Sequence, residues 1–289
     1  MAAHFGALIP HIRNDVHTFT AAAESYIAHG GQARFLPPII EYFGENQMLG
    51  TITPFDIKQM ALTLFPTQKN STRNRQAIAP TRAVMIHGYE RGWCHLMRLP
   101  NFRAEAPRRP VPASIPWLQI FVRQCDRDSL PHLAALVMFM SLTGARISEA
   151  INLRWSEVNL MTRSAVLLKT KTSTHSRRGL TDAMAKRLID LAVGQQTEDR
   201  VFRFKSRWSV NERIKAVCRR AEIAYKSPHV CGRHAFATNA MAMGADIKEA
   251  MEAGGWKSVD IFIGIYVHVP NADRLVANRF NGISFDVDI

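Results

Sequence analysis

The stretch SPHVCGRHAFATNAMAMG, residues 227–244, brings two histidines and an arginine together directly before an apolar, helix-like pattern. His229, Arg233 and His234 lie within six residues of one another. Residues of these types are most often structural or part of a solvated face. An arginine beside histidines can also bind a phosphate, since its planar group donates to two oxygens and stays charged at any relevant pH. The rest of the chain decides between these two interpretations.

The composition is that of a globular protein with an excess of positive charge. The 289 residues include 37 Lys and Arg against 24 Asp and Glu, which gives a formal net charge of +13. Residues 69–109 contain nine basic and two acidic side chains, and residues 200–233 contain ten and two. A chain this basic typically binds a polyanion, and we expect nucleic acid because no lipid-anchoring motif or amphipathic membrane helix stands out.

Several other classes of protein are disfavoured. No apolar run reaches the ~18 residues of a membrane helix, and the first residues lack the pattern of a signal peptide. We therefore expect a cytoplasmic protein with no membrane partner. The four cysteines form no C-x-x-C pair and the histidines are dispersed, so we expect neither a disulfide framework nor a metal site.

A proline-rich segment predicts two domains. FRAEAPRRPVPASIP, residues 102–116, contains four prolines and no periodic pattern, so we place a linker at 106–113. In the domain over residues 1–105, apolar residues at helical spacing predict about four helices. In the domain over residues 114–289 they predict helices and one hairpin, residues 164–181. The fold class is therefore mainly α with one small antiparallel sheet.

Local patterns predict where individual helices begin and end. Gly144 closes a strongly apolar helix that starts near residue 130, because glycine is favoured directly after a helix end. Arg146 then falls in the first turn of a second helix. Ser209 and Glu212 have the spacing of a capping box, which predicts a helix that begins at Ser209.

Several ordered motifs resemble the tyrosine recombinases of the phage integrase family. SLTGARISEAINLRW, residues 141–155, resembles the first arginine box of that family. GRHAFAT, GGWKS and IYVHV resemble its second box and its nucleophile segment. NSTRNRQAIAPTRAV, residues 70–84, is similar to the core-binding domains that precede such catalytic domains. The resemblance implies a helical core-binding domain that clamps DNA, followed by an α+β catalytic domain.

The resemblance also implies a set of catalytic residues around one phosphate. By the family pattern, Arg146 and Arg233 bind this phosphate, whose negative charge grows as an oxygen attacks it. Tyr266 is the nucleophile; its segment alternates like a strand, but the resemblance predicts a helix. Glu149 orients the arginines. Trp256 donates its indole N–H to a phosphate oxygen or packs against the nucleophile segment.

Two further roles have competing candidates. The family box usually has its histidine three residues before the arginine, whereas His229 precedes Arg233 by four. His229 is the first candidate for proton transfer, and His234 is the alternative. A hairpin lysine of this family protonates the departing 5′ oxygen, and Lys171 matches the family turn better than Lys169.

The implied function is that of a site-specific DNA recombinase, an integrase that works through a 3′-phosphotyrosyl intermediate without a metal or a cofactor. Its expected partners are double-stranded DNA, further copies in a homotetramer on paired recombination sites, and accessory DNA-bending proteins, all at the nucleoid. Lys69, Arg73 and Arg75 are the expected DNA contacts of the first domain. The apolar spacing after residue 270 predicts a tail helix that docks on a neighbouring subunit. A catalytically silent DNA-binding regulator and a type IB topoisomerase are the alternatives.

Overall fold

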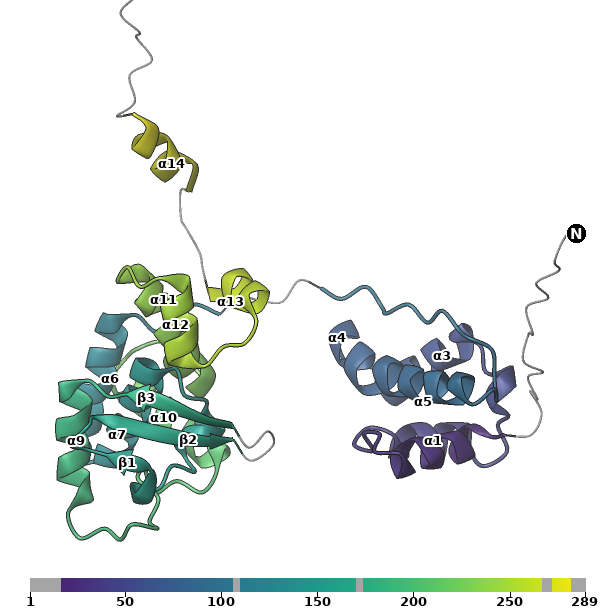
Figure 1. Cartoon of the computed structure of the whole chain (residues 1–289), viewed down its shortest axis with the longest axis horizontal. Coiled ribbons are helices and arrows are strands. Elements are labelled where there is room, and N and C mark those ends of the chain that lie inside the picture. The colour runs from purple at the N-terminus through teal and green to yellow at the C-terminus, as the bar shows by residue number, and fades with distance from the viewer. Residues whose placement is uncertain (1–16, 106–109, 170–173, 267–271, 282–289) are drawn as a thin grey trace, which may run out of the picture. The chain divides into compact units, whose positions relative to one another are not determined.

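The computed structural model describes residues 17–105, 110–169, 174–266 and 272–281 (Figure 1). The chain divides into two compact units, Met1–Arg108 and Arg109–Ile289. This division falls inside the segment 106–113, of which residues 106–109 lie outside the described residues. The described ranges are mainly helical with one three-stranded antiparallel sheet, so the predicted fold class is confirmed. In these ranges no helix is both long and apolar enough to span a membrane.

The first unit is built from short helices around its own hydrophobic core. Its elements are α1 (Phe19–Ala28), α2 (Pro37–Phe43), the 3-10 helix η1 (Leu49–Thr51), α3 (Pro54–Leu64), α4 (Asn70–Arg73), the π-helical turn η2 (Asn74–Ile78) and α5 (Ala79–Glu90). Thr53 and Asp56 form a capping box at the start of α3, which fixes where that helix begins. Fully buried side chains from α1, α3 and α5 meet in the core, and they include Phe19, Met60 and Val84.

In the second unit, several helices pack around helix α7, which supplies many residues of the hydrophobic core. Its elements are α6 (Ile115–Arg127), α7 (Pro131–Thr143), α8 (Ile147–Ala150), the 3-10 helix η3 (Trp155–Glu157), β1 (Val158–Asn159), β2 (Ser164–Lys169), β3 (Thr174–Gly179), α9 (Asp182–Ala192), α10 (Arg207–Arg220), the π-helical turn η4 (Val230–His234), α11 (Ala235–Ala242), α12 (Ile247–Gly254), α13 (Val259–Tyr266) and α14 (Ala272–Phe280). Helix α7 is apolar on all sides, as expected for a helix packed against several others. It contacts α6, α9, η4 and α11.

The sheet has the strand order β1-β2-β3, with both pairs antiparallel. Strands β2 and β3 pair from Ser164 opposite Gly179 to Lys169 opposite Thr174, which is the predicted hairpin. Ala165 is buried on the inner face of β2, and its partner on β3 is Arg178. The sheet therefore carries a buried arginine on its inner face.

Two predicted helix starts are wrong. Helix α10 begins at Arg207, because the Ser206 hydroxyl caps it by accepting from the backbone N–H of Trp208 at 3.1 Å. Ser209 lies inside this helix, and its hydroxyl donates to the carbonyl of Ser206 at 2.8 Å. Arg146 is the N-cap residue of α8, so it precedes the first turn of that helix. The end of α7 is as predicted, since Gly144 follows it with a φ of +67°.

Candidate active site

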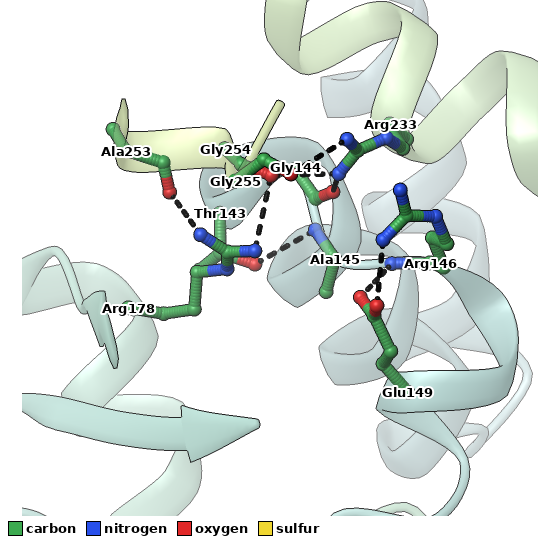
Figure 2. A network of polar contacts seen from close by, with 10 residues as sticks. All are labelled: Thr143, Gly144, Ala145, Arg146, Glu149, Arg178, Arg233, Ala253, Gly254 and Gly255. Atoms are coloured by element: carbon green, nitrogen blue, oxygen red, sulfur yellow. Dashed lines mark hydrogen bonds and ion pairs between the residues drawn. The ribbon is translucent and has the colours of Figure 1, made fainter. Parts of the chain in front are cut away.

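Arg233 lies in a buried polar network (Figure 2). Its Nη1 donates to the carbonyl oxygens of Gly144 at 2.6 Å and Gly254 at 2.7 Å. Its Nη2 donates to the carbonyl of Gly255 at 3.4 Å. The guanidinium carbon lies 3.4 Å from the centroid of the Trp256 ring, close enough for a cation–π interaction. Backbone carbonyls and an aromatic face hold this guanidinium in place. Among the described residues, no carboxylate forms an ion pair with it.

Glycines allow the backbone to approach the guanidinium this closely. Gly144 follows the end of α7 with a positive φ, and a Cβ at this position would lie 2.9 Å from the Phe236 ring. A Cβ on Gly254 would lie 1.8 Å from the Trp256 ring. Real Cβ atoms do not approach neighbours so closely, so a side chain at either position would displace the aromatic residues around Arg233.

Arg146 and Glu149 form an ion pair in the same region (Figure 2). Arg146 Nη1 donates to Glu149 Oε1 at 2.7 Å, and the backbone N–H of Arg146 donates to Oε2 at 2.9 Å. Burial alone would raise the pKa of the Glu149 carboxyl, but these hydrogen bonds and the charge of Arg146 outweigh burial and lower it. The Arg146 side chain is 47% exposed and that of Glu149 is 11% exposed. Glu149 therefore anchors an arginine that a ligand can still reach.

The region has an excess of positive charge. Figure 2 shows three guanidinium groups, those of Arg146, Arg178 and Arg233, and one carboxylate, that of Glu149. Burial and the charge of Arg146 lower the pKa of Arg233 to about 10. Among the described residues, the only ion pair in this set is Arg146 with Glu149. A bound phosphate would compensate the remaining cations, because buried charges are costly unless paired.

Sequence reasoning did not identify Arg178 as part of this region. This residue is only 1% exposed. Its Nη1 donates to the carbonyl of Ala253 at 2.5 Å, and its Nη2 to that of Gly254 at 3.0 Å. Burial lowers its pKa, while the charge of Glu149 opposes this shift. The pair Arg177 and Arg178 was the available signal, because adjacent residues of a strand point to opposite faces and one of the two must face the core.

The extra residue of the second box is accommodated in a π-helical turn. Residues Val230–His234 form the turn η4, which holds about one residue more than an α-helical turn. Consequently His229 and Arg233, four residues apart, are separated by about one turn. Gly232 lies where this turn presses on α7, since a Cβ there would be 2.7 Å from Met140 Cβ. The longer spacing therefore does not separate the histidine from the arginine.

The two histidines of the box have different surroundings. His229 is exposed to solvent, yet partial desolvation by the surrounding chain lowers its pKa, and the charges of Arg233 and Arg146 lower it further. His234 is 3% exposed, and its ring centroid lies 5.0 Å from that of Tyr266 in an edge-to-face arrangement. The structure thus places His234 against the tyrosine and leaves His229 open to a ligand.

Tyr266 is the last residue of helix α13, so the helix predicted from the family resemblance is confirmed and the strand-like pattern was misleading. Its side chain is 4% exposed. The phenol packs edge-to-face on Trp256, with ring centroids 5.2 Å apart, and against Phe262 at 5.5 Å. Trp256 therefore touches both the buried guanidinium and the tyrosine.

The two lysine candidates are at the end of β2 or between β2 and β3 in the sequence. Lys171 lies outside the described residues. Lys169 is the last residue of β2, and its side chain also lies outside what the structure describes. The other predicted residues of this unit lie in its described part, and their catalytic roles, like that of the lysine, stay predictions. In the described ranges no group of three or more His, Cys, Asp or Glu residues could hold a metal ion.

The three predicted DNA contacts of the first unit differ in their surroundings. Lys69 is exposed and lies 3.8 Å from the exposed carboxylate of Glu105. Arg73 donates to the carbonyls of Phe65 at 2.9 Å and Pro66 at 2.6 Å, so it ties the end of α3 to α4. Arg75 is exposed in the π-helical turn η2. A phosphate contact by Arg73 would therefore compete with its structural hydrogen bonds, whereas Lys69 and Arg75 are accessible.

Comparison with known proteins shows which family this chain resembles. Residues 119–272, more than half of the chain, match the model of the phage integrase family. The integrase of Salmonella phage P22 is 26% identical over 208 residues, which cover 65% of this chain and 52% of that protein. The chain therefore spans about half the length of this relative.

Solved structures share the fold at low sequence identity. The Tn1549 transposon integrase in complex with transposon right end DNA is 14% identical with a TM-score of 0.74, over 92% of this chain and all of that one. The XerH site-specific recombinase bound to palindromic difH substrate is 16% identical with a TM-score of 0.65, over 90% of this chain and 82% of that one.

Proposed function

Because this chain belongs to the phage integrase family, we propose that it is a site-specific DNA recombinase that cuts and rejoins DNA strands by transesterification. One observation supports this most strongly: a buried guanidinium, Arg233, and a tyrosine, Tyr266, pack on the same indole ring, that of Trp256, and no carboxylate neutralises the arginine within the described residues. This arrangement suits a reaction in which a phenol attacks a phosphodiester that the arginine binds.

In the proposed reaction, the Tyr266 oxygen attacks phosphorus and forms a 3′-phosphotyrosyl ester while the bond to the 5′ oxygen breaks. The phenol proton passes to His229 or to solvent, and Lys171 protonates the departing 5′ oxygen. The 5′ hydroxyl of another strand then attacks the ester and releases the tyrosine. The ester conserves the energy of the broken bond, so this reaction requires no nucleotide cofactor.

Arg233 and Arg146 both have N–H donors available for the proposed contacts to the phosphate. An arginine has five N–H donors, and three of those of Arg233 are used by backbone carbonyls. Two donors are left for the non-bridging oxygens of a phosphate. Arg146 is half exposed and anchored by Glu149, so it can bind the same phosphate from the solvent side. The indole N–H of Trp256 is a further donor.

We propose double-stranded DNA as the partner, at the nucleoid in the cytoplasm, with Lys69 and Arg75 among the phosphate contacts of the first unit. The assembly proposed is a homotetramer on paired recombination sites, helped by accessory DNA-bending proteins. Helix α14 supports the assembly, because its apolar residues Val276 and Phe280 are 49% and 60% exposed. Exposed apolar side chains on one helix are typical of a surface that binds a partner.

The proposal is tested by trapping the covalent intermediate. The protein is incubated with a pool of short nicked duplexes of randomised sequence, in which cleavage releases a short fragment and cannot be reversed. Adducts recovered after denaturation are sequenced, and the selected duplex becomes the substrate for kinetics. We expect that the peptide recovered in covalent linkage to DNA contains Tyr266. The variant Tyr266→Phe, which removes one oxygen and keeps the ring, should form no adduct. Tyr225→Phe, at a half-exposed tyrosine of the same unit, is the matched control. An adduct formed by Tyr266→Phe but not by Tyr225→Phe would identify a different nucleophile.

A further inference from the structure

The carbonyl oxygen of Gly254 accepts hydrogen bonds from two different arginines (Figure 2). Arg233 Nη1 donates to it at 2.7 Å and Arg178 Nη2 at 3.0 Å. Gly254 is the last residue of α12, and the last carbonyls of a helix receive no hydrogen bond from an N–H of the same helix. Here two cations occupy that end, where the helix dipole is negative. The position of one guanidinium is thus linked to the other through a single backbone oxygen.

We propose that Arg178 is a positioning residue for DNA strand cleavage, which holds Arg233 in its orientation through the carbonyl of Gly254. The inference rests on the proposed function, because only phosphate transfer reports on the orientation of Arg233. Both Nη atoms of Arg178 donate to backbone carbonyls, so the proposal gives this residue no contact with DNA. It acts on the reaction only through the residues it holds.

The geometry requires an arginine at this position. The two Nη atoms of Arg178 bind two successive carbonyls, those of Ala253 and Gly254, and a planar fork is suited to two acceptors held side by side. An aliphatic residue would leave both carbonyls without this donor. A Cβ on Gly255 would lie 2.6 Å from Nη2, so a glycine there leaves space for the fork. The corner formed by Gly254 and Gly255 is therefore shaped around the Arg178 guanidinium.

Strand β3 places this guanidinium. Arg178 lies opposite Ala165 of β2, so its side chain points to the inner face of the hairpin, while its neighbour Arg177 is exposed. The register of the hairpin thereby fixes the end of α12, which precedes Trp256 and the nucleophile helix α13. Arg177 provides a matched control, because it is the same residue type on the same strand and faces solvent.

The experiment compares Arg178→Leu, Arg178→Lys and Arg177→Leu on the duplex selected by wild-type protein. We expect Arg178→Leu to slow single-turnover adduct formation by about a hundredfold, the effect of misplacing a catalytic group by about 1 Å. Arg178→Lys should recover part of this loss, since it keeps the charge and one hydrogen bond. Affinity for uncleaved DNA and its salt dependence should stay at the wild-type level in all three variants. Arg177→Leu should cleave normally.

A double-mutant comparison separates positioning from general stability. If Arg178 acts through Arg233, removing it in an Arg233→Lys background should slow cleavage far less than in the wild type. In a substrate with sulfur in place of the departing 5′ oxygen, the leaving group needs no proton donor. This substrate bypasses the hairpin lysine but not Arg233, so it should not restore cleavage by Arg178→Leu. Full rescue by sulfur would show that Arg178 acts through the hairpin lysine, and it would overturn the proposed route.

Each remaining outcome decides between the two proposals. A wild-type adduct together with unchanged cleavage by folded Arg178→Leu and Arg178→Lys overturns the positioning role alone. Failure of the wild type to form any adduct on the whole pool removes the proposed function as well. If thermal unfolding shows that Arg178→Leu is not folded, Arg178→Lys and Gly255→Ala test the positioning role instead. The added methyl of Gly255→Ala displaces the same guanidinium from the other side.

Discussion

Replacing Gly144 by alanine should damage the site more than it damages the fold. Gly144 has a φ of +67°, and its carbonyl accepts from Arg233. The new Cβ would lie 2.9 Å from the ring of Phe236, 3.1 Å from Gly254 Cα and 3.2 Å from the ring of Trp256. These neighbours surround the buried guanidinium, so any shift that relieves the contact moves the groups that hold it.

The magnitude follows from two separate costs. A residue with a Cβ in the left-handed conformation costs about 1–2 kcal/mol relative to glycine. Overpacking in a close-packed region costs about 1–3 kcal/mol more. Gly144→Ala should therefore lower the free energy of unfolding by about 2–5 kcal/mol. Gly194 is the matched control, since it follows a helix end with a φ of +72° and has no atom within 4 Å of the position of a Cβ. Gly194→Ala should cost only the first amount.

Urea denaturation of both variants and of the wild type measures the two costs, and the difference between the variants isolates the contact with the site. Single-turnover adduct formation on the selected duplex should fall by about a hundredfold in Gly144→Ala and stay unchanged in Gly194→Ala. Equal stability losses in the two variants, or wild-type cleavage by Gly144→Ala, would show that the packing around Arg233 tolerates a methyl group and that the close approach has no role.

Three further predictions concern pH, salt and assembly. The pKa of His229 lies below its ordinary value, so its ring is neutral at pH 7 in the free protein. Single-turnover cleavage should decrease as the pH falls through that lowered pKa, because protonation removes the base. His229→Ala should abolish this inflection of the pH profile. A pH profile that stays the same in His229→Ala would transfer the role to His234 or to water. If Lys69 and Arg75 each contact a phosphate, Lys69→Ala and Arg75→Ala should each reduce the slope of log affinity against log salt concentration by about 0.9. Filter binding at several salt concentrations measures this slope. An unchanged slope would remove that residue from the interface. Deletion of residues 271–289 should weaken assembly on paired sites, seen by gel shift, more than binding to a single site, and equal losses would indicate packing within one chain.

Ordered motifs grouped Arg146, Arg233 and Tyr266, which are far apart in the chain, and the structure places Arg233 and Tyr266 against the same indole ring. Their catalytic roles stay predictions. The strand-like alternation before Tyr266 was misleading because a short apolar run fits either period, and the family resemblance, not the local pattern, predicted the helix.

Features that depend on tertiary contacts were not predictable. The start of α10 was misplaced because Ser206 and Ser209 both offer a capping hydroxyl, and local spacing does not rank them. The burial of Arg178 was missed because its acceptors, the carbonyls of Ala253 and Gly254, belong to a segment about 75 residues away and carry no side-chain signal. Backbone acceptors are present at every residue, so sequence alone does not show which of them an arginine will use.

The π-helical turn at Val230–His234 also bears on how the second box can change in length. An extra residue in an ordinary helix rotates everything after it by about 100°, which would turn the face of α11 away from the core. A π-helical turn confines the insertion to a single turn and leaves the following helix in register. The box can therefore gain a residue through one mutational event without a second, compensating change elsewhere. A search pattern with a fixed distance of three residues between histidine and arginine would therefore miss this chain.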